Sequence, residues 1–221
     1  WVPIILLSDY LVELHLLLAG WLLAPGFVGV LHVCFRLRML ASFGMRALYS
    51  VFLPDLYAAH ARGDRDRLAR DLTRGNALVL AYTAAVCGAA IVLGKPFLAL
   101  FGTEFTQGYL SLVIVSLSMI PRAIFGPTTA IMAAAGRQTP MIACLIAGIA
   151  LSAIFISQSW AALGMLGIAI GYTLAITFAS IAQWVCTLKV TGIDCSIFAA
   201  VRHRPGAGLT RGWLLGLASN R

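Results

Sequence analysis

The sequence contains few charged residues for its length. Only 11% of its 221 residues are Asp, Glu, Lys or Arg, whereas 61% are hydrophobic. Soluble globular domains carry about 25% charged and about 45–50% apolar residues. A soluble chain of this size has too small an interior to bury so much apolar surface. The scarcity of charge therefore predicts an integral membrane protein whose apolar surface is solvated by its partner, the lipid bilayer.

The patterns that mark catalytic and metal sites are also missing. No Ser/His/Asp arrangement, HExxH motif or phosphate-binding glycine loop occurs. The five cysteines are scattered without the spacing of metal ligands. We therefore expect no enzyme activity, no metal and no cofactor. The formal charge of +8 does not predict nucleic-acid binding, because the basic residues interrupt apolar runs instead of lying among stacking aromatics.

Six apolar runs approach or exceed the length of about 20 residues that a membrane-spanning helix needs. They are residues 1–23, 27–53, 77–101, 109–135, 141–156 (or to 160) and 163–188. The runs are continuous and do not alternate in ten-residue units, which favours helices over barrel strands. The sequence thus predicts an all-α fold, an integral membrane bundle of six transmembrane helices over residues 1–188, followed by a cytoplasmic juxtamembrane tail at 189–221.

The basic residues indicate the orientation of this bundle. Five arginines crowd the segment at 58–76 after the second run, and Arg137 follows the fourth. Lys189, Arg202, Arg204 and Arg211 follow the sixth. The connections at 24–26, 102–108 and 157–164 contain no lysine or arginine. The positive-inside rule therefore places both termini, and the C-terminal ends of the even-numbered spans, in the cytoplasm. We expect the segment 58–76 to form a short amphipathic cytoplasmic helix with Leu68 and Leu72 on one face.

Ionisable residues within the first two runs are candidates for function, because such groups are costly inside a bilayer. The first run contains Asp9, Glu13 and His15, and the second contains Arg36 and Arg38. The two runs form a hairpin, and counting from its turn puts Glu13 level with Arg38 and His15 level with Arg36. We expect the acids and arginines to approach one another. Two interpretations remain open: an ion pair that fastens the two spans together, or groups that face a substrate.

Arg122 is the third arginine of interest. It lies near the middle of the fourth run, beside Pro121 and shortly before Gly126 and Pro127. Prolines free backbone carbonyls and kink helices, and they are tolerated where a helix faces protein or a water-filled cavity. Arg122 could bind an anionic group such as phosphate through its guanidinium fork, or it could cap the freed carbonyls.

Several segments, read in order, resemble the C-terminal half of polysaccharide-export flippases of the multidrug/oligosaccharidyl-lipid/polysaccharide superfamily. The matching segments, within residues 8–192, are SDYLVEL, GFVGVLHVCFRLRML, LPDLYAAHARGDRDRLARDL, LFGTEFTQG, AAAGRQTP and LGMLGIAIGYTLA. Each segment is weakly specific alone, and their common order and spacing carry the resemblance. The chain departs from the family near Leu31, where an aromatic residue often follows the glycine of the second span.

The resemblance implies one lobe of a MATE-like flippase fold in a bacterial plasma (inner) membrane. Family members have two such lobes, so the chain is expected to be a C-terminal fragment that needs its N-terminal lobe or a second copy. The resemblance further implies alternating access around an anionic, lipid-diphosphate-linked sugar. Arg36, Arg38 and Arg122 are then the candidate substrate-binding residues. Asp9, Glu13 and His15 are the candidates for ion coupling or for pairing within the membrane.

Three other functions remain possible from the residues. The chain could be a lobe of a multidrug or cation antiporter of the same superfamily, although arginines in the second span would repel a hydrophobic cation. It could instead be a membrane scaffold or enzyme that acts on lipid-linked intermediates, or a truncated product without function.

Overall fold

The structure is a computed structural model that describes residues 2–63, 65–137 and 139–199, with the backbone alone at residues 2–9, 60, 61, 65 and 66. Within these residues every regular element is a helix, which confirms the predicted all-α fold. The elements in chain order are α1 (Val2–Leu22), α2 (Pro25–Ala61), α3 (Arg65–Ala99), the 3-10 helix η1 (Thr103–Gly108), α4 (Tyr109–Leu117), α5 (Met119–Phe125), α6 (Thr128–Ala134), α7 (Thr139–Leu163) and α8 (Met165–Thr191).

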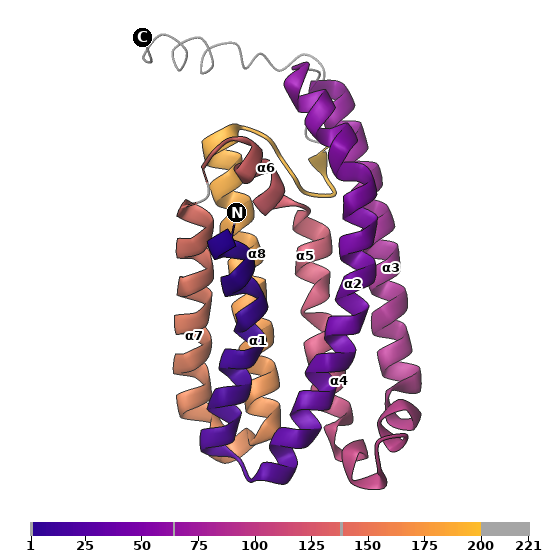
Figure 1. Cartoon of the computed structure of the whole chain (residues 1–221), viewed down its shortest axis with the longest axis vertical. Coiled ribbons are helices and arrows are strands. Elements are labelled where there is room, and N and C mark those ends of the chain that lie inside the picture. The colour runs from indigo at the N-terminus through magenta and orange to yellow at the C-terminus, as the bar shows by residue number, and fades with distance from the viewer. Residues whose placement is uncertain (1, 64, 138, 200–221) are drawn as a thin grey trace.

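The helices run up and down along one common axis (Figure 1). In that view α1, α7 and α8 form one side of the bundle, and α2 to α5 form the other. The two sides are joined because α8 contacts both α4 and α5 as well as α7. Large buried side chains from both sides meet in one core: Leu11, Leu31, Phe35, Leu112, Ile168 and Tyr172.

Five helical stretches of the described residues are long and apolar enough to cross a membrane. They are Pro25–Ala59, Arg67–Ala99, Thr103–Phe125, Thr139–Leu163 and Met165–Thr191. The first predicted span coincides with α1, whose described side chains give a shorter apolar stretch, Tyr10–Leu22. The chain therefore has the helices of a multi-pass membrane protein, and the count of six spans stays a prediction.

The C-terminal ends of the even-numbered predicted spans lie together at one end of the bundle. The α2–α3 turn, the α6–α7 connection and the end of α8 share the upper end in Figure 1, while the α1–α2, α3–η1 and α7–α8 connections share the lower end. This arrangement agrees with the alternation of basic and non-basic connections along the sequence. Which end faces the cytoplasm remains an expectation from the positive-inside rule.

The second helix continues past the proline that was expected to end it. α2 includes Pro54 and ends only at Ala61. A proline within a helix leaves the carbonyl four residues earlier, here that of Ser50, without its N–H partner. Both Ser50 and Pro54 are exposed, so a polar environment at the surface can satisfy this carbonyl.

The expected separate helix at 58–76 is instead divided between two long helices. Residues 58–61 end α2, a turn follows with Gly63 at φ 70°, and residues 65–76 begin α3. The predicted common face of Leu68 and Leu72 is confirmed, but it is buried against Leu56 and Ala59 of α2. Burial of this face against α2 keeps α3 helical from the tip of the hairpin into the span.

The fourth predicted span is broken where it was expected to be continuous. The chain leaves helical geometry at Gly126, whose φ is 72°, and the separate helix α6 starts after Pro127. Gly126 reaches this left-handed conformation without steric cost, and Pro127 lacks the N–H needed to continue the ladder. Pro121 lies in the first turn of α5, where a missing N–H is tolerated.

Candidate functional site

The charged residues of α3 give a scale of depth for the bundle. Arg74 and Lys95 are 21 positions apart with no charged residue between them, which is about 31 Å of helix. This length equals the hydrocarbon thickness of about 30 Å. A Cβ on Gly75 would lie 3.4 Å from the Phe52 ring, so Phe52 of α2 is level with the Arg74 end of this span.

Two arginines of α2 lie well inside the apolar span on this scale. Arg38 is 14 positions and Arg36 is 16 positions before Phe52, or about 21 and 24 Å along the helix. Both residues are thus about 7–10 Å inside the Lys95 boundary. At such a depth a charge needs a partner, a protein environment or water.

Glu13 of α1 and Arg36 of α2 form an ion pair on the surface of the bundle. The distance from Arg36 Nη2 to Glu13 Oε1 is 3.5 Å, and the two side chains are 51% and 45% exposed. Arg36 Nε also donates to His32 Nε2 at 3.2 Å. The expected approach of an acid to an arginine therefore occurs, but Glu13 pairs with Arg36 and not with Arg38. Successive residues of a helix are 100° apart, so Arg36 and Arg38 point in opposite directions.

Arg38 is directed into the bundle. Its side chain is 7% exposed, and its Cζ lies 5.2 Å from the centroid of the Tyr172 ring of α8. Nε is buried without a hydrogen-bond partner, and no carboxylate of the described residues pairs with the guanidinium. A cation over an aromatic face gains about 2 kcal/mol when desolvated, which offsets only part of the cost of burial. The guanidinium thus retains unused capacity to bind an anion.

His15 contacts the same tyrosine. Its ring meets the Tyr172 ring edge-on, with centroids 5.3 Å apart. Nδ1 donates to the Leu11 carbonyl at 2.8 Å, and Nε2 lies 3.1 Å from the Ser152 hydroxyl of α7. The predicted proximity of His15 to Arg36 gives no contact between them, because His15 is buried between α1, α7 and α8. Its contacts connect α1 to the last hairpin.

The exposed side of α2 carries a further arginine that was not among the predicted site residues. His32, Arg36, Phe43, Arg46 and Ser50 are all exposed, and their spacing places them on one helical face. Arg46 is six positions before Phe52, or about 9 Å inside the Arg74 boundary. Applying the rule on intramembrane charge to every residue of the second run would have identified it. We call these five residues, together with Glu13, the α1–α2 face.

Arg122 lies nearer to the end of its span than to the middle, where it was expected. The span ends at Phe125, and the neighbouring Gly126 packs against Asn76 of α3, two residues from Arg74. Asn76 in turn accepts a hydrogen bond from the Tyr49 hydroxyl of α2, with Asn76 Oδ1 at 3.4 Å. The position follows from the break at Gly126, which shortens the helix. Arg122 is thus separate in depth from Arg36 and Arg38.

The backbone of Asp9 belongs to α1, but its side chain lies outside the described residues.

Residues 192–199, which directly follow α8 and were expected to belong to a tail, pack against the bundle. We call residues 192–199 the docked segment. Asn76 Nδ2 donates to the Cys195 carbonyl at 2.7 Å, and the Ile197 N–H donates to the Ile124 carbonyl at 2.9 Å. Trp184 Nε1 donates to Asp194 Oδ1 at 2.9 Å. The docked segment therefore ties α8 to α3 and α5, and no periodic pattern in the sequence predicts these contacts.

Cys195 is the central residue of the docked segment. Its side chain is fully buried. Burial raises the pKa of this thiol well above its ordinary value, and the nearby Asp194 carboxylate raises the pKa further. A protonated thiol is a weak nucleophile, so Cys195 is inert while the segment is docked.

The site thus consists of a cationic face on α1 and α2 with Arg38 buried behind it. Guanidinium groups bind phosphate and carboxylate oxygens strongly. The described residues contain no group of three His, Cys, Asp or Glu side chains placed to hold a metal ion. The chemistry present is therefore suited to electrostatic binding of an anion.

Comparisons of the chain with protein-family models, with curated proteins and with solved structures find no match.

Proposed function

We propose that this chain is one lobe of a membrane transporter that moves an anionic, lipid-linked sugar across the bilayer. The observation that carries the proposal is the charged α1–α2 face within the depth of the hydrocarbon. Lipid does not solvate an exposed ion pair such as Glu13–Arg36, so this face borders a water-filled cavity, a second lobe or a second copy of the chain. Transporters place their substrate sites in such cavities between lobes.

The sign of the charge supports an anionic substrate. Arg36 and Arg46 lie on the α1–α2 face, and among the described side chains of that face Glu13 is the only acid. Arg38 adds a buried guanidinium that no carboxylate of the described side chains neutralises. A multidrug antiporter would have to bring a cation towards these arginines, which repel it. The resemblance of the sequence to polysaccharide-export flippases supplies the lipid-diphosphate-linked sugar as the substrate class.

Water accessibility tests the environment of the α1–α2 face. Phe43→Cys places a thiol on this face, and Val92→Cys places one on an exposed part of α3 within its apolar span. In bilayers, a polar, membrane-permeant thiol reagent should label position 43 readily and position 92 slowly, because thiolate forms only in water. Equal, slow labelling at both positions would show that lipid covers the α1–α2 face and would refute the cavity.

Ligand binding tests the substrate class. The full-length chain in nanodiscs should bind a soluble short-chain lipid diphosphate linked to a sugar more tightly than the same molecule without its phosphates. Arg38→Gln should weaken this binding by about tenfold or more, since a hydrogen bond to a charged group contributes about 1.5–3 kcal/mol. Arg137→Gln, at an exposed arginine beyond the spans, is the matched control. Binding that ignores the phosphates, or that Arg38→Gln leaves unchanged, would contradict the proposal.

A further inference from the structure

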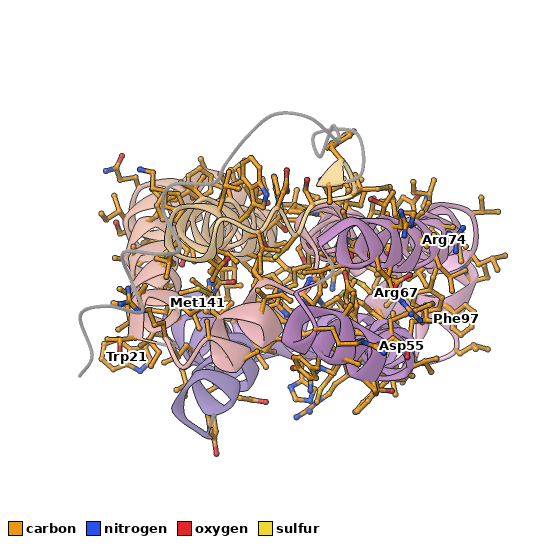
Figure 2. The ribbon with its side chains drawn as sticks, turned by 90° about the horizontal axis from the view of Figure 1, so that it is seen from above. Trp21, Asp55, Arg67, Arg74, Phe97 and Met141 are labelled. Atoms are coloured by element: carbon orange, nitrogen blue, oxygen red, sulfur yellow. The ribbon has the colours of Figure 1, made fainter. Side chains whose placement is uncertain are left out.

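Three arginines form a stripe at the start of α3. Arg67, Arg70 and Arg74 are spaced by three and four residues, so they share one helical face. The opposite face is fixed, because Leu68 and Leu72 are buried against α2. The arginine stripe is therefore held on the outside of the bundle. Seen from the end of the molecule, Arg67 and Arg74 lie on the α2–α3 side (Figure 2).

The same face of α3 continues downward as an apolar surface. Below Arg74 it presents four exposed residues at helical spacing: Leu78, Ala81, Ala85 and Val92. Leu78 is 48% and Val92 is 74% exposed. In a membrane protein, exposed apolar side chains within a span contact lipid. The arginine stripe thus lies directly above lipid, and not above the bundle core.

The depth of the stripe matches the headgroup layer. Arg74 marks the end of the apolar span, and Arg70 is four positions beyond it, or about 6 Å further along the helix. The polar layer on each side of a bilayer is about 5–8 Å thick. Arg70 and Arg74 therefore lie at the level of lipid phosphates.

Among the described side chains, two of the three arginines have no acidic partner. Arg67 pairs with Asp71 one turn later, with Arg67 Nε 3.7 Å from Asp71 Oδ2. No ion pair joins Arg70 or Arg74 to any acid among the described residues, and both side chains are exposed. Residues four apart on a helix lie about 6 Å from each other, so both guanidinium groups can reach one phosphate.

We propose that Arg70 and Arg74 form a binding site for the phosphate headgroup of an anionic phospholipid, on the lipid-facing side of α3. The lipid tails lie along the apolar surface from Leu78 to Val92, and its phosphate accepts hydrogen bonds from the two guanidinium groups. The site is distinct from the α1–α2 face, so it does not depend on what the chain transports.

Lipid retention tests this proposal on the full-length chain. The chain is purified in mixed micelles of phosphatidylglycerol and phosphatidylcholine, and the ratio of the two lipids that remain bound is measured by native mass spectrometry. The wild-type chain should prefer phosphatidylglycerol. The double variant Arg70→Gln/Arg74→Gln should lose this preference by roughly fivefold per arginine. Arg70→Lys/Arg74→Lys should keep most of it, and Arg137→Gln should keep all of it.

Three outcomes would overturn the site. The double glutamine variant could retain the wild-type preference, which would show that the arginines are merely hydrated. The lysine variant could lose as much as the glutamine variant, which would assign the effect to packing and not to charge. Inorganic phosphate, added at the same concentration as the lipid, could displace phosphatidylglycerol completely, which would identify a site for soluble anions.

Discussion

The guanidinium of Arg38 lies over the ring of Tyr172, with Cζ 5.2 Å from the ring centroid. The same ring receives His15 edge-on, and Phe35 meets it at a centroid distance of 4.9 Å. One aromatic side chain of α8 thus connects a buried cation of α2 with a buried histidine of α1. The stability of the fold and the binding of an anion can therefore be tested separately at Arg38. Its packing against Tyr172 does not need the charge, whereas Nε of its guanidinium has no hydrogen-bond partner.

Replacing Arg38 by methionine should stabilise the fold and abolish anion binding. Methionine has a similar length, packs against Tyr172, and removes a charge that is buried without an acidic partner. We expect the free energy of unfolding to rise by about 1–3 kcal/mol, as measured by unfolding in detergent. A large loss of stability, with binding of the lipid diphosphate intact, would show that Arg38 has a purely structural role.

Removing the charge of Glu13 should have little effect on stability. The Glu13–Arg36 pair is about half exposed, and exposed pairs contribute less than about 1 kcal/mol. Glu13→Gln and Arg36→Gln should each change the free energy of unfolding by less than about this amount. In bilayers, a cost of several kcal/mol for Glu13→Gln would mean that Arg36 is left unpaired in lipid, which contradicts a hydrated α1–α2 face.

Alanine at position 126 should disrupt the docked segment. Gly126 has φ 72°, and a Cβ there would collide with the Cys195 carbonyl and lie 2.7 Å from Asn76 Nδ2. Gly136→Ala is the matched control, because Gly136 has φ 68° with nothing within 4 Å of its Cβ position. We expect a loss of about 1–2 kcal/mol for Gly136→Ala and about 2–4 kcal/mol for Gly126→Ala.

The thiol of Cys195 reports the same event. Gly126→Ala should make Cys195 reactive towards maleimide, located by peptide mass mapping, while Gly136→Ala should leave it protected. Equal protection in both variants would show that the docked segment adapts to the added methyl group.

The stability of the fold should fall at alkaline pH because of Cys195. Burial and Asp194 raise the pKa of this thiol in the folded chain. Above the unfolded value of about 8.5, the unfolded chain releases a proton that the folded chain retains. Folding at such a pH therefore requires the thiol of Cys195 to take up a proton. The contribution of Cys195 to the free energy of unfolding is complete below about pH 8.5. It declines as the pH rises, by up to about 1.4 kcal/mol per pH unit.

Cys195→Ala isolates this contribution. Between pH 8 and pH 10, the difference in unfolding free energy between the wild-type chain and Cys195→Ala should shift in favour of the variant. A difference that is independent of pH over this range would show that Cys195 ionises equally in the folded and unfolded chains.

Composition and hydrophobic patterning were enough to predict the all-α fold and the five long apolar helices of the described residues, while the count of six spans stays a prediction. Long apolar runs must be helical in lipid, since every backbone N–H and C=O needs a partner within the segment. The common face of Leu68 and Leu72 followed from the same periodicity. Counting from the first hairpin also predicted that Glu13 would approach an arginine of the second span, because depth along a helix is proportional to residue number.

The tertiary structure decided which way each of these residues points and what lies opposite. Sequence spacing sets a residue's depth in a helix, but the rotation of that helix depends on packing against neighbours far away in the chain. Arg36 is therefore exposed and Arg38 is buried against Tyr172, while His15 bonds to Ser152, 137 positions later. The docked segment and the place of Arg122 likewise depend on the break at Gly126. The Cys195 carbonyl and Asn76 lie so close to this residue that they leave no room for a Cβ.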